Sequence, residues 1–210
     1  LRGDPVSQTA LLSTTIQATM LTHRILDEKN TRESDGIWGT KTFVFTDKLD
    51  VNNRLYFGYL DAEGWTPWQQ PNHNGPLARL RSSSPNVSPK QLSYLGQDWS
   101  MSKAIGYGLD SHDQAKVKRI SSQDPGYDYD SDVVITTATL ELGFNDPDVG
   151  AVIQHKAPTE MTSYLQRKGR AGRRREMHPW MLVVLSDFGR DRVAYQQYEN
   201  LIDPEITLQR

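Results

Sequence analysis

The chain has 210 residues, of which 36% are hydrophobic and 24% charged, with a formal net charge of -2 and no cysteine. This balance is typical of a soluble globular domain, and the missing cysteines exclude a disulfide framework and a thiolate metal site. No apolar run approaches the roughly 20 residues of a membrane span, and the first residues have no signal-peptide pattern, so we expect a cytoplasmic protein with no membrane partner.

Helical and extended patterns alternate in the first part of the chain. Apolar residues recur at helical spacing between residues 8 and 28, and a β-rich run follows at 41–46. Asp47 would then cap a second helix, whose apolar face runs from Leu49 to Leu60 and which ends at Gly64. Residues 65–115 are rich in proline and have little periodicity, so we expect an irregular insertion with one helix near residues 90–106.

Four short runs in the second part favour strands: 116–120, 132–137, 151–155 and the apolar 180–186. A helix is expected to begin at Pro158, and another spans 191–202. Near-continuous apolar strands that alternate with helices predict an α/β fold, with a parallel sheet covered by helices on both faces. We expect one domain over residues 1–210, and the missing initiating Met suggests a fragment of a larger protein.

Residues 166–176 (QRKGRAGRRRE), here called the arginine run, crowd six cations together. These are Arg167, Lys168, Arg170, Arg173, Arg174 and Arg175. Such a cluster repels itself unless an anion lies within it, and the guanidinium fork matches phosphate oxygens. Arg170 and Arg173 are three residues apart and would project the same way in a helical turn. A solvated basic face is the plainer interpretation, but Gly169 and Gly172, which let the backbone turn, weaken it.

A second polar stretch follows the expected strand at 132–137, which ends in Thr136 and Thr137. Gly143 then breaks the pattern before Asn145 and Asp146. In open α/β sheets, ligands bind at the carboxyl ends of the strands, where hydroxyls and carboxylates can contact a phosphate, a ribose or a metal-bound water. A threonine-rich strand end and an Asx-type turn explain the same residues equally well without any function.

Three segments together resemble motifs of superfamily 2 (DEAD/DEAH-like) helicases. TTATLELGFND (136–146) resembles motif V, QRKGRAGR (166–173) resembles motif VI, and KTFVFTD (41–47) resembles the short motif IV. The motif VI pattern of Gln, two residues, Gly-Arg, two residues and Arg is fully met. The resemblance covers residues 41–60 and 132–202, and it implies the C-terminal RecA-like domain of a two-domain motor.

The resemblance also implies roles for individual residues. In this family ATP binds between two RecA-like domains, so Arg170 and Arg173 would be arginine fingers that neutralise the transferring γ-phosphoryl group. The residues implied to border the nucleotide are Gln166, Gly143, Asn145 and Asp146. Asn145 stands where many family members have Asp, and Asp146 beside it could take that role. Thr46 and Thr137 would contact the backbone of DNA or RNA.

The 210 residues contain no G-x-x-x-x-G-K-[ST] loop and no D-E-x-[DH] motif. The resemblance therefore implies that an N-terminal RecA-like domain of the same protein holds Mg²⁺ and most of the ATP, and that this fragment alone is inactive. Two alternatives remain open. One is a non-catalytic nucleic-acid or protein interaction module derived from a helicase domain, and the other is a different enzyme whose arginine run grips a phosphorylated substrate.

Three weaker patterns have structural interpretations. The run at 128–132 (DYDSD) starts like a calcium loop, but Val133 replaces the required glycine. His155 follows an expected strand end, where packing is a simpler role than zinc binding. Trp65 and Trp68 could stack on single-stranded bases, although we favour their anchoring an irregular loop on the core.

Overall fold

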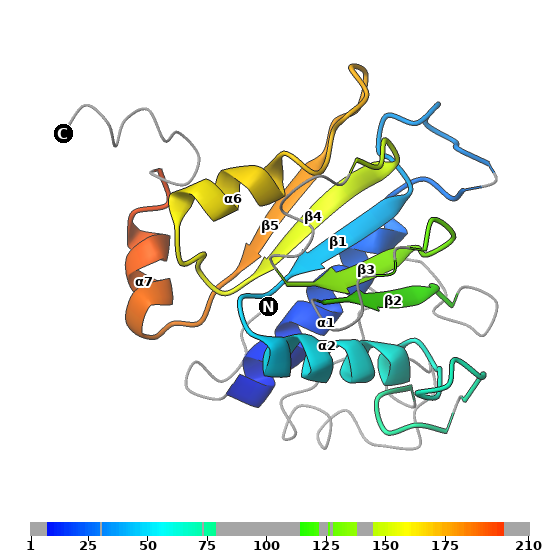
Figure 1. Cartoon of the computed structure of the whole chain (residues 1–210), viewed down its shortest axis with the longest axis horizontal. Coiled ribbons are helices and arrows are strands. Elements are labelled where there is room, and N and C mark those ends of the chain that lie inside the picture. Colours follow the sequence, from blue (N-terminus) through cyan, green and yellow to red (C-terminus); the bar gives the residue numbers. More distant parts are fainter. Residues whose placement is uncertain are drawn as a thin grey trace.

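The computed structural model describes residues 8–29, 31–72, 74–78, 114–121, 126, 128–137 and 145–199. In that part of the chain, five strands form one sheet in the order β2-β3-β1-β4-β5 (Figure 1). The strands are β1 (Lys41–Phe45), β2 (Val117–Ile120), β3 (Val133–Thr136), β4 (Val149–His155) and β5 (Trp180–Val184). Every neighbouring pair is parallel, which confirms the predicted α/β class.

Helices cover both faces of the sheet, as predicted. Side chains alternate between the two faces along each strand, so Val44, Ile135 and Ile153 pack with α1 (Gln8–Arg24) and α2 (Leu49–Ala62). Phe43, Phe45 and Val152 form the second core on the opposite face. The segment that follows α6 (Met161–Lys168) closes this face, and Figure 1 shows α6 and α1 on opposite sides of the sheet. The last described helix, α7 (Gly189–Gln196), follows β5.

Two local predictions were wrong. The N-cap of α2 is Lys48, which makes no side-chain capping bond, whereas the Asp47 carboxylate accepts hydrogen bonds from Arg167 and Thr159. The guanidinium carries a full positive charge, whereas the helix N-terminus offers only backbone N–H groups, so the carboxylate pairs with Arg167 and does not cap the helix. The apolar β5 is also less buried than its sequence indicates, because it is an edge strand of the described sheet and Trp180 is 42% exposed.

The expected insertion leaves and rejoins the domain at one point. Gln114 Nε2 donates to the carbonyl oxygens of Glu63 (2.7 Å) and Gly64 (2.8 Å), and Trp65 Nε1 donates to Ala115 O (2.8 Å). Trp65 therefore anchors the start of the insertion on the core, as predicted. Trp68 does not, because it is 81% exposed. The helix expected near residues 90–106 lies outside the described residues.

No helix in the described part of the chain has the length and hydropathy that crossing a bilayer would require.

Candidate functional site

The carboxyl edge of the sheet, where the parallel strands end, brings together the two threonines predicted to contact nucleic acid. β1 and β3 are neighbours with Phe45 opposite Thr136, and Thr46 N donates to Thr136 O (3.0 Å). Thr46 and Thr137 therefore leave adjacent strands side by side. Thr46 is fully buried and its hydroxyl donates to Lys48 O (3.1 Å), whereas Thr137 is half-buried.

The arginine run begins in the last turn of α6, which Gly169 caps. Arg167 is 3% exposed, and its Nη1 donates to Asp47 Oδ1 (2.6 Å) and to Gln154 Oε1 (2.7 Å). Arg167 therefore fixes the end of α6 to the end of β1 and to β4. Gln166, on the same helix, is half-buried.

After α6 the run turns toward the amino edge of the sheet, where the strands begin. Gly172 N donates to Val149 O (3.2 Å), and Gly172 has φ +72°, with Pro179 Cγ only 2.6 Å from where a Cβ would lie. Only glycine fits such a position. Arg170 lies half-buried just before this turn, and Arg173 lies exposed just after it.

The two arginines beyond the motif differ from each other. Arg174 pairs with Asp148 Oδ1, which also accepts from Arg32 Nη2 (3.3 Å). A carboxylate just before β4 therefore holds Arg174. Arg175 is exposed. The arginine run is thus fixed to the domain at both flanks of Arg170 and Arg173.

The nucleotide candidates Asn145 and Asp146 lie at the amino edge, not at the carboxyl edge where the sequence placed them. They lead directly into β4, whose first residue is Val149. Asp146 is 3% exposed, its Oδ2 accepts from Lys41 Nζ (2.6 Å), and its Oδ1 accepts from Asp148 N (2.8 Å). Asn145 is exposed, and Gly143 lies outside the described residues.

The candidates therefore form two groups. The turn that carries Asn145 and Asp146 adjoins the end of the arginine run through the Arg174–Asp148 pair. Thr46 and Thr137 lie at the opposite edge of the sheet. A domain built in this way can present one edge to a nucleotide and another to a strand.

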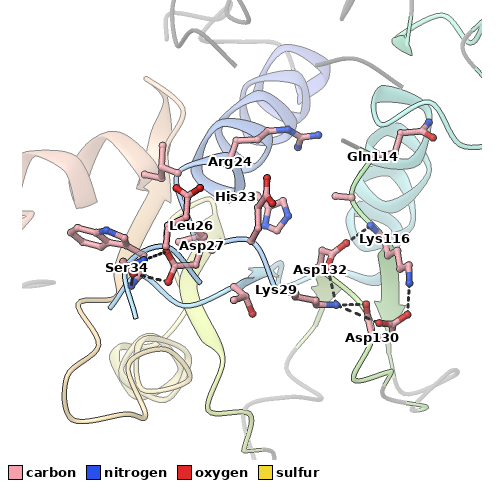
Figure 2. Close-up of a pocket in the computed structure, with 16 residues that line it drawn as sticks. His23, Arg24, Leu26, Asp27, Lys29, Ser34, Gln114, Lys116, Asp130 and Asp132 are labelled. Carbon is pink, nitrogen blue, oxygen red and sulfur yellow. Dashed lines mark hydrogen bonds and ion pairs between the residues drawn. The ribbon is translucent and has the colours of Figure 1, made fainter. Parts of the chain in front are cut away.

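A cavity of about 770 Å³ at the amino edge was missed by sequence reasoning, because its lining comes from three distant segments (Figure 2). Lys29 Nζ lies 2.8 Å from Asp132 Oδ1, and the Lys116 backbone donates to Asp132 Oδ2 (2.7 Å). The Lys116 side chain bonds Asp130, which lowers the pKa of that carboxyl and raises the pKa of the ammonium group. Asp130 and Asp132 of the 128–132 run are thus paired with lysines.

Two histidines, the buried His155 and the half-buried His23, are neutral structural groups. His155 ends β4, and its Nδ1 lies 2.8 Å from Thr15 Oγ1 on α1, which confirms its packing role. Burial and the adjacent Lys156 charge lower the pKa of His155 to about 4. Burial and the neighbouring Arg24 likewise lower the pKa of His23 to about 4.

Residues 98–175 match the family model described as helicase conserved C-terminal domain. Over that segment the chain is similar to the C-terminal domains of helicases. The matched segment contains the whole of the candidate motifs V and VI, and with the parallel sheet it confirms the predicted resemblance and RecA-like fold class. No curated protein sequence matches the chain significantly.

Several solved helicase structures are similar to this chain. The DUF1998 helicase MrfA bound to DNA has 14% identity and a TM-score of 0.48, over 94% of this chain and 20% of that one. Dbp5 of S. cerevisiae bound to RNA and ADP BeF3 has 16% identity and a TM-score of 0.46, over 92% and 37%. Domain 2 of the DEAD-box helicase Mss116p bound to an RNA duplex has 13% identity and a TM-score of 0.43, over 84% and 52%. The chain thus spans about half of these proteins or less.

Proposed function

We propose that this chain is the second motor domain of an ATP-dependent helicase or translocase that acts on DNA or RNA. Arg170 and Arg173 would supply arginine fingers to an ATP site shared with a first RecA-like domain. The family match over both motifs, with an arginine run held at both flanks, carries the proposal.

The finger role follows from the charge that develops during phosphoryl transfer. The transition state spreads negative charge over the γ-phosphoryl oxygens, and an arginine finger that neutralises it is worth about 10³–10⁵ in rate. Such donors act best when they are already in place before the reaction. Arg167 and Arg174, on either side of the fingers, limit the positions that Arg170 and Arg173 can take.

The acids of this domain do not suit a Mg²⁺ site. Asp146 and Asp148 are paired with Lys41 and Arg174, and in the described residues no three acidic or histidine side chains gather as metal ligands would. We therefore assign Mg²⁺, and most contacts to ATP, to the first domain. Bound there, Mg²⁺ would neutralise charge on the β- and γ-phosphates.

The nucleic-acid role rests on the carboxyl edge. Thr137 and the backbone beside Thr46 would contact phosphates of one strand, on the side of the sheet opposite the turn that holds Asn145. Hydroxyls and backbone N–H groups are common phosphate contacts that carry no sequence information, which suits a motor that moves along any sequence. Closure of the two domains on ATP would change the grip on the strand, and hydrolysis would release it.

ATP hydrolysis by the intact protein, with and without single-stranded DNA or RNA, tests this function. Stimulation by either strand supports the motor, and it names the strand chemistry in the same experiment. Arg173→Ala should lower the hydrolysis rate by about 10³-fold or more with little change in nucleotide affinity. Arg175→Ala is the matched control, because Arg175 is also exposed but lies outside the motif.

Two outcomes would contradict the proposal. Equal hydrolysis by the Arg173→Ala variant and its parent would remove the finger assignment. A folded parent that hydrolyses no ATP with either strand would favour the non-catalytic module, in which the arginine run is a binding patch.

A further inference from the structure

Arg167 is a buried charge with a specific set of partners. Its Nη1 is shared between Asp47 Oδ1 (2.6 Å) and Gln154 Oε1 (2.7 Å), and its guanidinium carbon lies 5.4 Å from the centroid of the Phe45 ring. Phe45 is fully buried, so the guanidinium rests on the core of the sheet. The Asp47 side chain is 25% exposed, but Arg167 is buried, so loss of this partner would leave the guanidinium charge uncompensated inside the domain.

Asp47 joins the end of β1 to both ends of α6. Its Oδ1 accepts from Arg167 in the last turn of that helix, and its Oδ2 accepts from Thr159 Oγ1 (3.0 Å) just before the helix begins. The residue before Asp47 is Thr46, whose backbone is bonded to Thr136 at the carboxyl edge. A displacement of the chain at Thr46 therefore acts directly on the carboxylate that holds α6.

The other end of this connection reaches the proposed fingers. Gly169 N donates to Leu165 O (2.9 Å), and Arg170 N donates to Arg167 O (2.9 Å), so the turn that carries Arg170 is bonded to the last turn of α6. Moving the Arg167 guanidinium thus moves the backbone on which Arg170 stands. The path from Thr46 at the proposed strand contact to Arg170, a proposed finger, therefore crosses four residues, two of which form the Asp47–Arg167 ion pair.

We infer that the Asp47–Arg167 ion pair couples strand binding at the carboxyl edge to the position of the arginine fingers. Asp47 and Arg167 are positioning residues in this inference, which rests on the proposed motor function. The element that moves in this inference is α6, because the Asp47 carboxylate accepts hydrogen bonds from both of its ends. Because the buried Arg167 charge resists losing its partner, a shift at Thr46 is passed to α6 and not absorbed between them.

The test uses the intact protein with Asp47→Asn and Arg167→Lys, which keep size but remove the charge or the guanidinium fork. Hydrolysis is measured without a strand and with saturating single-stranded DNA or RNA, and strand affinity is measured by fluorescence anisotropy. In each variant the stimulation factor, the stimulated rate divided by the strand-free rate, should fall at least about fivefold, the lower range of coupling between two sites. Strand affinity should change less than the stimulation factor.

Arg119→Lys is the matched control. Arg119 also lies with its guanidinium carbon 5.4 Å from an aromatic centroid, that of Tyr56, and its Nη1 donates to Asn53 Oδ1 (2.7 Å). It stands on β2, away from α6, so its substitution should leave the stimulation factor unchanged. The double variant Asp47→Asn, Arg167→Lys should be no worse than either single variant, because both break the same pair.

Three results would contradict the inference, and each identifies a different reason. If the strand-free and stimulated rates fall in proportion while the melting temperature falls, the pair only supports the fold and the inference is wrong. If the stimulation factor is unchanged, the inference is wrong while the motor function stands. If the parent itself shows no strand-stimulated hydrolysis, the proposed function fails first and the inference fails with it.

Discussion

Glu63→Gln should be among the most destabilising single-atom changes in the domain. The Glu63 side chain is fully buried, and its two oxygens accept from three donors. Arg24 Nη1 and Nη2 each lie 2.7 Å from one oxygen, and Ala115 N lies 3.2 Å from Oε2. Burial alone would lower the pKa of Arg24, but the Glu63 charge and its hydrogen bonds raise it above the ordinary value. An arginine side chain stays protonated in proteins, so the guanidinium remains charged after the substitution.

The magnitude follows from this geometry. Glutamine offers one acceptor oxygen to three donors, and its NH₂ group would face a donor in either orientation of the amide. The Arg24 charge, on a side chain only 9% exposed, is then left uncompensated. Breaking a buried pair in this way costs about 3–5 kcal/mol. For a protein of this size that corresponds to a fall in melting temperature of roughly 6–20 °C.

Urea unfolding of the parent and the variant, followed by circular dichroism, measures this change. Asp187→Asn is the control, because Asp187 also pairs with an arginine, Arg192, but at 3.8 Å and with the Asp187 side chain 73% exposed. That variant should change the free energy of unfolding by less than about 0.5 kcal/mol. A loss below about 1 kcal/mol for Glu63→Gln would refute the reasoning, since it would mean that water or another group replaces the lost charge.

Two further predictions concern pH and packing. Because burial lowers the pKa of His155 to about 4, the stability that this group contributes is complete above pH 6.5, and it is lost as the pH falls from 6.5 toward 4. The free energy of unfolding should change with pH by up to about 1.4 kcal/mol per unit because of this group, and His155→Gln should remove that contribution. Urea unfolding at pH 5–7 measures it, and equal slopes in the parent and the variant would contradict the prediction. Gly150→Ala should cost at least about 2 kcal/mol, because its Cβ would lie 1.7 Å from the Trp38 carbonyl oxygen. Gly189→Ala, whose Cβ meets nothing within 4 Å, should cost less, because only the left-handed backbone at φ +57° opposes it. Equal losses in thermal melts of the two variants would rule out the close approach as the cause.

The sheet could be predicted because its strands have a simple physical signature. Segments such as 132–137 and 151–155 are apolar along most of their length, as strands buried on both faces must be. Their order in the sheet could not be predicted. The first strand in the chain, β1, lies in the sheet between β3 and β4. That order depends on pairing between distant segments, which a single sequence does not state.

The prediction that Asn145 lies at the carboxyl edge was wrong for a geometric reason. The rule that ligands bind at strand ends assumes that residues after a strand stay near its carboxyl edge. Asn145 lies eight positions after Thr137, and an extended chain covers about 26 Å in eight steps. The seven residues of β4 span only about 23 Å, so the connection is long enough to return to the amino edge. The rule therefore holds for Thr137 but not for residues that already lead into the next strand.

The structure also answers why a chain of net charge -2 tolerates six adjacent cations. Asp47 and Asp148, both far from the arginine run in sequence, neutralise Arg167 and Arg174 at its two flanks. Part of the positive charge of the arginine run is therefore neutralised by carboxylates of the same domain and needs no ligand. The arginines that the motif assigns to phosphate lie between these two fixed points. Because the two flanks are already fixed, the arginines of the proposed ATP site would need little further ordering when the phosphate binds, and preordered donors stabilise the transition state best.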